Sequence, residues 1–469
     1  MSLTRRGRTT LLVAGVLCTA GAVLLAASGL RTDAAAAAGG DSAPPVTTPL
    51  ASPRRAPAVF EDAAVAGARF AANANLSQQL QSVLAPFQGC ATAEVDGHVA
   101  ASIDTEQSFA PASTLKLVVA LAAVQKLGAD HRFATTAGVD AGGNLVVTGG
   151  GDPMLATAAF VTQQEARPHH RDVAYTPLAE LADKIVASGV QNVPAILVDD
   201  RRHDSLRFLP DWKSNYVPDG EIGALGALAV DGGLTDPVAR IAATDPAITT
   251  GQRLAELLAA RGVTVGGIQR GAASGAVREV AKIESTPLAD IVGMMVTTSD
   301  NFVAETLVRE IGYAAAPGKP ATTAEGLAEV RRILEGLRIP VDGLSLLDGS
   351  GLAPNARMRC ETLLGVVDVS QTPKFEAVDK SLAVAASTGT LVETFVGDPL
   401  AGQLRGKTGS LSGVVGLAGV VDSGAGPRFA FLATGNFSDD QGEDLQVAVG
   451  RAVGSYPVLR PPAGLVPVP

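Results

Sequence analysis

The chain of 469 residues is 46% hydrophobic, which excludes wholesale disorder and allows two or more domains with sizeable cores. Its formal net charge of -10 argues against nucleic acid as a partner, because binding to phosphates requires an excess of positive charge. An almost wholly apolar run from Leu11 to Leu30 has the length needed to cross a membrane, and it follows three arginines. We expect this segment to direct export with the arginines on the cytoplasmic side, and we favour an uncleaved membrane anchor over a cleaved signal peptide.

The rest of the chain is organised around one interrupted domain. Residues 1–38 are predicted to form the cytoplasmic N-terminus and the anchor or signal segment, and residues 39–68 a flexible tether rich in proline and alanine. Residues 69–135 and 285–469 are predicted to be two parts of one catalytic domain. Between them, residues 136–284 alternate short strands and helices with glycine-rich turns, which indicates an inserted accessory module of α/β type.

Regular elements are predicted from hydrophobic periodicity and turn residues. A helix begins near Leu76 and is followed by two strands, 90–95 and 98–103, joined by an Asp-Gly hairpin turn. A buried helix starts at Ser113, where apolar residues recur with a helical period as far as Leu127. Later in the chain we predict helices over 177–188, 251–261, 288–295, 302–310 and 443–453, and strands over 195–198, 404–407, 414–421 and 429–434.

Two cysteines, Cys90 and Cys360, follow the export segment. An even number of cysteines in an oxidising compartment permits one disulfide. The alternative is a pair of buried thiols, because the sequence does not show whether the two Cα atoms lie within bonding distance. Both interpretations stay open at this point.

Three short motifs each occur once and in a fixed order. They are Ser-Thr-Leu-Lys at 113–116, Ser-Asp-Asn at 299–301 and Lys-Thr-Gly at 407–409. A hydroxyl is a weak nucleophile at neutral pH and needs a base. Lys116 lies one helical turn from Ser113, among apolar neighbours whose packing would lower its pKa. Together the motifs describe a serine acyl-transfer site.

The second and third motifs offer groups that a substrate needs. Ser299 and Asn301 lie two residues apart in a turn, so that one can relay a proton while the other offers its amide to a carbonyl group. Lys407 and Thr408 are placed to bind a carboxylate, and Gly409 on an edge strand lets a peptide backbone approach. Each motif alone has an ordinary explanation, such as a helix cap or a strand end, but all these accidents would have to occur in the right order.

Other candidate sites carry weaker signals. The five histidines lack the spacing of metal ligands, so we expect neither a metal nor another cofactor. Residues 348–352, Asp-Gly-Ser-Gly-Leu, look at first like a second serine site, but the glycines around Ser350 indicate a tight turn near the cleft. The glycine run at 149–151 is not a phosphate cradle, because neither a lysine nor a helix start follows it.

The ordered motifs resemble those of the penicillin-binding proteins and serine β-lactamases. The interval between Ser113 and Ser299 is longer than in compact β-lactamases. In this respect the chain is similar to the low-molecular-weight class C penicillin-binding proteins, the D-alanyl-D-alanine carboxypeptidase/endopeptidase family, which carry inserted domains there. The likeness covers roughly residues 76 to 455. Its further matches are 151–153, 197–200, Trp212 with 223–230, 348–352 with Asn355, 389–391 and 407–410; residues 353, 354 and 356 depart from the usual pattern.

This resemblance implies an α+β fold and a set of site residues. The fold would be a penicillin-binding transpeptidase-like domain, an antiparallel sheet flanked by helices, with a large α/β insertion between the first two motifs. Ser113 would be the nucleophile and Lys116 its base, and Ser299 and Asn301 would relay protons and hold the substrate. The resemblance also implies a substrate-binding strand made of Lys407, Thr408, Gly409 and Ser410, with an oxyanion hole formed by the backbone N–H groups of Ser113 and Ser410.

The same resemblance implies partners, activity and location. We expect a serine D,D-carboxypeptidase that acts on peptidoglycan stem peptides through an acyl-enzyme, with D,D-endopeptidase activity at the same site and β-lactam antibiotics as covalent inhibitors. The alternatives are a β-lactamase and a non-catalytic scaffold that binds the cell wall. The folded part would lie outside the cytoplasm, either anchored in the membrane through the N-terminal segment or secreted after cleavage.

Overall fold

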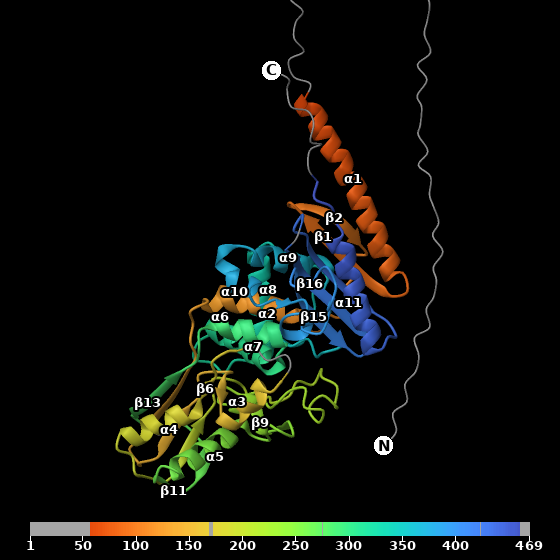
Figure 1. The fold of residues 1–469 in the computed structure, drawn as a ribbon. Helices are drawn as coiled ribbons and strands as arrows, with labels where there is room; N and C mark the ends of the chain where they lie inside the picture. The colour runs from red at the N-terminus through yellow and green to blue at the C-terminus, as the bar shows by residue number, and fades with distance from the viewer. Residues whose placement is uncertain (1–56, 168–171, 274, 423, 460–469) are drawn as a thin grey trace, which may run out of the picture. The chain divides into compact units, whose positions relative to one another are not determined.

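The computed structural model describes residues 57–167, 172–273, 275–422 and 424–459 (Figure 1). The apolar run from Leu11 to Leu30 lies outside these residues. Among the helices that the model describes, none combines the length and the apolar character needed to span a membrane.

A six-stranded antiparallel sheet forms the centre of the catalytic part. Its strand order is β14 (Ala383–Val384), β15 (Leu404–Leu411), β16 (Val414–Val421), β17 (Arg428–Thr434), β1 (Gln88–Val95) and β2 (His98–Ile103). The predicted hairpin between β1 and β2 is confirmed, because Asp96 and Gly97 both have positive φ, 50° and 74°, as a two-residue hairpin turn requires. The last strand, β17, pairs with β1, so that the N-terminal and C-terminal parts of the catalytic domain share one sheet.

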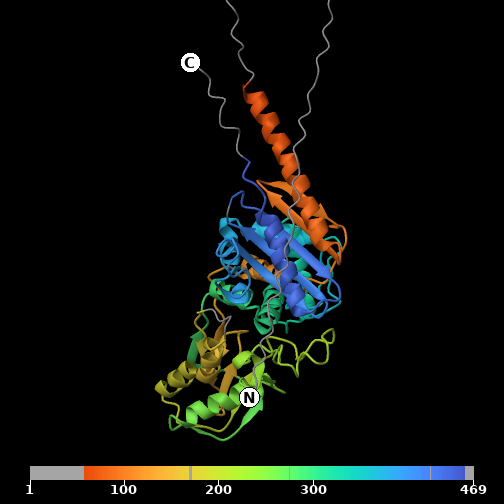
Figure 2. The same ribbon diagram turned by 45° about the vertical axis from the view of Figure 1, so that its right-hand side comes forward.

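Helices cover both faces of this sheet (Figures 1 and 2). On one face lie α1 (Pro57–Leu84) and α11 (Asp439–Gly454), and on the other α2 (Leu115–Leu127), α6 (Leu288–Thr298), α7 (Asn301–Ala315), α8 (Thr323–Gly336), α9 (Cys360–Ser370) and α10 (Glu376–Asp379). The alternation of side chains along β17 shows why two layers form. Phe429 and Phe431 pack toward α1 and α11, whereas Ala430 and Leu432 pack toward the α2 side.

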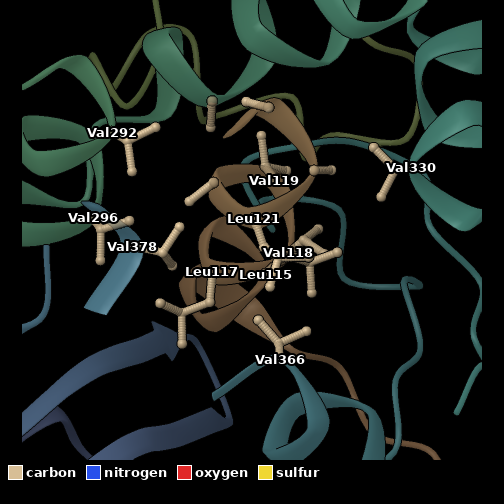
Figure 3. Close-up of a cluster of buried hydrophobic side chains, with 14 of the residues drawn as sticks. Leu115, Leu117, Val118, Val119, Leu121, Val292, Val296, Val330, Val366 and Val378 are labelled. Atoms are coloured by element: carbon tan, nitrogen blue, oxygen red, sulfur yellow. The ribbon is translucent and has the colours of Figure 1, made fainter. Parts of the chain in front are cut away.

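Helix α2 is buried on all sides. From Leu115 to Val124 every residue is buried, and most are aliphatic, which is the pattern of a core helix and not of a surface helix. Figure 3 shows its side chains pointing outward into α6, α8, α9 and α10, where they meet Val292, Val330 and Val366 among others. The one charged residue in this buried stretch is Lys116. A lysine in such a place is costly unless its ammonium group is bound, so this burial requires hydrogen-bond partners for Lys116 inside the core.

The inserted module contains a second, mixed sheet. Its strand order is β12 (Ile268–Arg270), β8 (Ile196–Asp199), β4 (Leu145–Thr148), β3 (Ala134–Val139) and β13 (Arg278–Glu284). Strand β8 pairs in parallel with β12 and β4, whereas β3 pairs antiparallel with both β4 and β13. Helices α4 (Leu178–Ala187) and α5 (Pro246–Ala259) pack on this sheet. Smaller elements complete the module: α3 (Ala158–Glu165), and the strand pairs β5 (Leu155–Ala156) with β6 (Thr176–Pro177), β7 (Asn192–Val193) with β11 (Thr264–Val265), and β9 (Leu234–Asp236) with β10 (Ile241–Ala242).

This architecture confirms the predicted α+β class, with an antiparallel sheet flanked by helices and an α/β insertion between the first two motifs. The exact domain boundaries stay a prediction. Helix α7 begins at Asn301, one residue before its predicted start, and α11 begins at Asp439, four residues before its predicted start. Two further helices begin five or more residues earlier than predicted. Helix α1 begins at Pro57, so that residues 57–68 of the expected tether are helical, and α5 begins at Pro246. The start of α5 has a clear local signal, because Asp245 caps the helix and proline is favoured at the first helical position.

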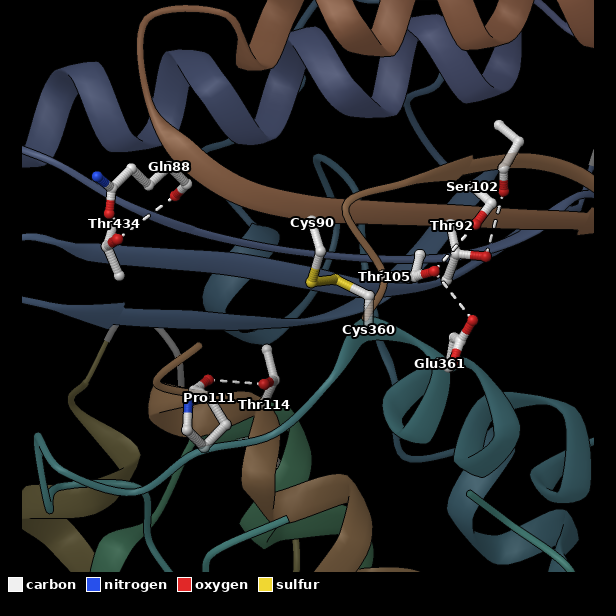
Figure 4. The surroundings of a disulfide bond; sticks show 11 residues. Gln88, Cys90, Thr92, Ser102, Thr105, Pro111, Thr114, Cys360, Glu361 and Thr434 are labelled. Atoms are coloured by element: carbon white, nitrogen blue, oxygen red, sulfur yellow. Dashed lines mark hydrogen bonds between the residues drawn. A yellow bond between two sulfur atoms is a disulfide. The ribbon is translucent and has the colours of Figure 1, made fainter. Parts of the chain in front are cut away.

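The two cysteines form a disulfide. Cys90 on β1 is bonded to Cys360 at the start of α9, with their Cα atoms 5.9 Å apart, and both side chains are buried (Figure 4). A second link lies beside it, where the Thr105 hydroxyl donates a hydrogen bond of 2.9 Å to Glu361. The open question about Cys90 and Cys360 is thereby decided in favour of the bridge, which joins residues 270 positions apart.

Candidate active site

Ser113 lies in a short 3₁₀ turn, η1 (Ala112–Thr114), directly before α2. The helix proper therefore begins two residues later than predicted. Ala112 has a positive φ of 45°, and Gly351 packs against it so closely that a Cβ on Gly351 would clash with the Ala112 carbonyl oxygen. Because Gly351 also has a positive φ, 84°, only glycine suits this position, and the expected tight turn at 348–352 is found.

Lys116 makes three hydrogen bonds from its buried ammonium group. Nζ lies 2.8 Å from Ser113 Oγ, 2.7 Å from Asn301 Oδ1 and 2.7 Å from the carbonyl oxygen of Ser350. Burial lowers the pKa of Lys116 from 10.5 to about 8, because the loss of hydration outweighs the attraction of nearby carboxylates, of which Asp348 acts most strongly. At pH 7 about a tenth of the molecules then carry a neutral Lys116, against about one in three thousand for an ordinary lysine.

These contacts also fix the direction in which neutral Lys116 can accept a proton. A neutral amine has two N–H donors and one lone pair. The Asn301 amide oxygen and the Ser350 carbonyl oxygen can only accept, so each of them takes one N–H. The lone pair is then left for the hydroxyl of Ser113, which can donate. The arrangement thus leaves the lone pair of neutral Lys116 facing the hydroxyl of Ser113, as a general base would require.

The Ser-Asp-Asn motif forms the junction between α6 and α7. Ser299 ends α6 in the left-handed conformation with φ 64°, and Asp300 caps α7 through its side chain. Asn301 is the first residue of α7. Its Oδ1 accepts from Lys116, and its Nδ2 donates to the carbonyl oxygen of Glu221 at 2.9 Å. The Ser299 side chain lines the cleft, and its hydroxyl has no hydrogen bond within the described residues.

The Lys-Thr-Gly motif lies on the exposed edge of the main sheet. Strand β14 covers only the first part of β15, so that from residue 407 onward β15 pairs with β16 alone among the described strands. Lys407 is fully buried beneath this edge, and its Nζ donates to the Thr408 carbonyl oxygen at 2.8 Å. Burial, together with the nearby charge of Lys116, holds the pKa of Lys407 well below its usual value.

The other residues of this strand divide between the cleft and the core. Thr408 and Ser410 line the cleft, and Thr408 Oγ1 lies 2.8 Å from Thr390 Oγ1. Gly409 faces the turn η1, where a Cβ would come within 2.9 Å of the Pro111 carbonyl oxygen. The missing side chain of Gly409 therefore makes room for the turn that carries Ser113, and the expected approach of a substrate backbone stays a prediction.

A cleft of about 770 Å³ opens in front of Ser113. The catalytic part lines it with Ser113, Ser299, Asn301, Thr408 and Ser410, and the inserted module lines it with Phe160, Gln164, Arg167, Lys213, Glu221 and Arg240, among others. The module therefore forms one wall of the site. The two buried lysines, Lys116 and Lys407, lie behind this surface.

Two buried carboxylates near Lys116 were not predicted to belong to the site. Glu305 accepts hydrogen bonds from the backbone N–H groups of Gly349 and Ser350, and Asp348 accepts one from Trp212 Nε1 at 2.9 Å. One signal for Glu305 is present in the sequence. It follows Asn301 by four residues on a helix, a spacing that places both on one face.

In this chain an antiparallel sheet lies with its free edge beside a Ser-x-x-Lys pair at the start of a buried helix. This is the architecture of penicillin-binding serine proteins. The model of the "D-Ala-D-Ala carboxypeptidase 3 (S13) family" matches residues 73–240 and 222–453. The chain belongs to this family.

Individual relatives agree with this assignment. Carboxypeptidase DacB of Mycolicibacterium smegmatis is 30% identical over 358 residues, covering 73% of this chain and 75% of the relative. A D-alanyl-D-alanine carboxypeptidase of Actinomadura sp. is 26% identical over 456 residues, covering 77% and 80%. Among solved structures, penicillin binding protein 4 (dacB) from Haemophilus influenzae superposes with a TM-score of 0.68 at 19% identity over 81% of this chain and 99% of that chain, which shows a shared fold.

Proposed function

We propose that this protein is a serine D,D-carboxypeptidase that removes the terminal D-alanine from peptidoglycan stem peptides. The observation that carries the proposal is the 2.8 Å contact between Lys116 Nζ and Ser113 Oγ at the base of an open cleft. Membership of the D-Ala-D-Ala carboxypeptidase family supports the substrate. D,D-endopeptidase activity belongs to the same proposal, because cleavage of a D-alanyl cross-link would use the same groups of this open cleft.

The reaction begins when Ser113 gives its proton to neutral Lys116 and its Oγ attacks the carbonyl carbon of the penultimate D-alanine. The negative charge on that carbonyl oxygen is stabilised by the backbone N–H groups of Ser113 and Ser410. When the peptide bond breaks, the leaving nitrogen takes the proton from Lys116, directly or through the Ser299 hydroxyl. A water molecule then gives a proton to the same base and attacks the carbonyl carbon of the acyl-enzyme. The bond to Ser113 Oγ breaks, Oγ takes the proton back, and the shortened peptide is released.

Recognition of the terminal carboxylate is assigned to Lys407 and Thr408. Lys407 is a buried amine with no ion pair among the described residues, and burial lowers its pKa; a substrate carboxylate beside it would favour its charged form and pair with it. The hydroxyl of Thr408 reaches the cleft directly. The substrate backbone can then extend along the unpaired edge of β15, where hydrogen-bonding groups of the strand are free of a partner among the described strands.

The same site is proposed to react with β-lactams. Their strained amide carbonyl and carboxylate match the groups that Ser113 and Lys407 would engage, and ring opening gives an acyl-enzyme on Ser113. Because peptidoglycan lies outside the cytoplasmic membrane, the catalytic part is placed outside the cytoplasm. We further propose that residues 11–30 export it and anchor it; these lie outside the described residues.

The test is labelling with a fluorescent penicillin, followed by measurement of D-alanine release from a pentapeptide and from a cross-linked dimer. The native protein is expected to carry one stable label and to release D-alanine, and Ser113→Ala is expected to do neither. Ser188→Ala, an exposed serine at the end of α4, serves as the matched control and should behave as the native protein.

Other outcomes would identify the alternatives. Absence of label on the native protein would overturn the proposal and favour a non-catalytic wall-binding scaffold. Rapid label turnover without D-alanine release would favour a β-lactamase. Cleavage of the dimer alone would assign the protein to the endopeptidases.

The acylation rate is expected to depend on pH through Lys116. The base must be neutral, so the maximal rate constant should be low in acid and should rise through a midpoint near the pKa of Lys116, about 8. The measurement uses a saturating β-lactam, whose carboxylate already pairs with Lys407, so that the profile reports Lys116. Circular dichroism over the same range controls for unfolding. A rate that is constant from about pH 6 to pH 9 would contradict this role of Lys116.

A further inference from the structure

The peptide group between Ser350 and Gly351 is fixed at both of its ends. Its carbonyl oxygen accepts from Lys116 Nζ at 2.7 Å, and its N–H, on Gly351, donates to Asp348 Oδ1 at 3.0 Å. The two preceding peptide groups are fixed as well, because the N–H groups of Gly349 and Ser350 both donate to Glu305 Oε1, at 2.9 and 2.7 Å. The acceptor that receives one N–H of Lys116 is therefore held by two buried acids.

The two acids differ in how completely they are bound. Asp348 accepts from the N–H of Ala353 at 2.7 Å and from Trp212 Nε1 at 2.9 Å, in addition to Gly351, so both of its oxygens are engaged. Glu305 uses Oε1 for the loop, while its buried Oε2 has no hydrogen-bond partner within the described residues. Asp348 therefore belongs to the loop itself, whereas Glu305 ties the loop to α7 from outside.

Helix α7 thus helps to hold Lys116 in two ways, one direct and one through the loop. Asn301 at its first position binds Nζ directly, and Glu305, one turn later, holds the loop that binds Nζ from another direction. Gly349 lies so close to α7 that a Cβ there would clash with the Val308 side chain, so the loop packs directly against the helix that carries Glu305.

We propose that Glu305 is a positioning residue of the reaction: by holding the Gly349 and Ser350 peptide groups it keeps the Ser350 carbonyl on Lys116, and so keeps the lone pair of Lys116 directed at Ser113. This inference rests on the proposed function and deepens it. Glu305 contacts no substrate, and it acts through the loop.

The charge of Glu305 has a second effect on Lys116. The groups that face Lys116 are Asp348 in the loop, Asp300 and Glu305 at the start of α7, Glu221 in the module and the amine of Lys407 on β15. The four carboxylates raise the pKa of Lys116 and thereby offset part of the effect of burial. Glu305 in turn faces the negative charge of Asp348, and burial foremost, with that charge, raises the pKa of Glu305 to about 7. Glu305 also faces the charge of Arg309 on the same helix.

Two substitutions separate the hydrogen bonds of Glu305 from its charge. Glu305→Gln keeps an oxygen that accepts from Gly349 and Ser350, and its amide nitrogen takes the place of the oxygen without a partner. Its maximal acylation rate should stay within about threefold of the native rate, but the midpoint of the pH profile should move to lower pH, because a negative charge near Lys116 is lost. Glu305→Leu removes both hydrogen bonds, and its maximal rate should fall by about tenfold or more.

Glu310→Gln is the matched control on the same helix. Glu310 is equally buried and pairs with Arg202 and His203, and within the described residues no hydrogen bond or ion pair joins its side chain to the loop at 348–352. Its substitution should lower the thermal unfolding temperature while the pH midpoint of acylation stays unchanged. The same unfolding measurement shows whether Glu305→Leu is folded under the assay conditions.

A direct titration makes the test independent of acylation. The ¹³C resonance of the carbon next to Lys116 Nζ, assigned through its loss in Lys116→Met, should titrate at lower pH in Glu305→Gln than in the native protein and should be unmoved in Glu310→Gln. The inference would be overturned if both Glu305 variants titrated at the native pH and were acylated at the native rate. It would also be overturned if Glu305→Gln and Glu305→Leu lost the same fraction of the rate. If Lys116 titrates at lower pH in Glu305→Gln than in the native protein, but the native protein takes no penicillin label, only the proposed function is refuted.

Discussion

Lys116→Met is expected to slow the acylation of Ser113 by about 10²- to 10⁴-fold, the usual contribution of a general base. Methionine has a similar length and suits a buried apolar helix, but its sulfur cannot take the proton from Ser113. The loss should appear in the maximal rate of reaction with a fluorescent penicillin, measured by stopped flow. The pH dependence through about 8 should vanish at the same time, because the group that titrates there is absent.

Lys126→Met provides the control for this experiment. Lys126 lies in the last turn of the same helix, is partly exposed and pairs with Glu329 at 2.7 Å, far along α2 from Ser113. Its replacement should leave acylation unchanged. A Lys116→Met protein that folds, as judged by circular dichroism, and still reacts at the native rate would rule out Lys116 as the base.

Replacing both Cys90 and Cys360 with alanine is expected to lower the free energy of unfolding by about 3 to 5 kcal/mol. The bridge joins residues 270 positions apart, and a cross-link that closes so long a loop removes much of the conformational freedom of the unfolded chain. In the folded state it holds β1 to the start of α9 (Figure 4). The change is measured as a lower midpoint of unfolding in urea at unchanged pH and temperature.

The native protein unfolded and refolded with a reductant is the control, and it should match the double variant because it lacks the same cross-link. A thiol assay on the unreduced, denatured exported protein should find neither Cys90 nor Cys360 titratable. An unchanged urea midpoint in the double variant would show that the bridge contributes nothing measurable to stability.

Local features of the fold were predictable from the sequence, and pairings between distant segments were not. The Asp-Gly turn after Val95 and the apolar period after Ser113 are encoded within a few residues, and both predictions are confirmed. No such pattern indicates that β17 pairs with β1, since that choice depends on the shapes of whole surfaces. The start of α1 was missed for a local reason: residues 57–68 are dominated by alanine and carry no apolar stripe.

The candidate site divides in the same way. The closeness of Ser113 and Lys116 follows from helical geometry, since they stand three residues apart. The hydrogen bond from Lys116 to Asn301 crosses 185 positions and was not predicted, although the resemblance to a family implied that both residues belong to one site. The part played by the Ser350 carbonyl was out of reach, because a backbone oxygen has no signature in the sequence. The proton relay assigned to Ser299 stays a prediction.

The pairing of the first strand with the last has a consequence for biogenesis. Gln88 on β1 pairs with Thr434 on β17, so a ribosome adding about 5 to 20 residues per second needs about 20 to 90 seconds to deliver the whole sheet. During that time the apolar segment that becomes α2 has been made, while α6 to α10, which will enclose it, are still to come. Under the export proposed for residues 11–30, such a nascent chain would thread through a membrane pore while unfolded and would acquire its shape only on the far side.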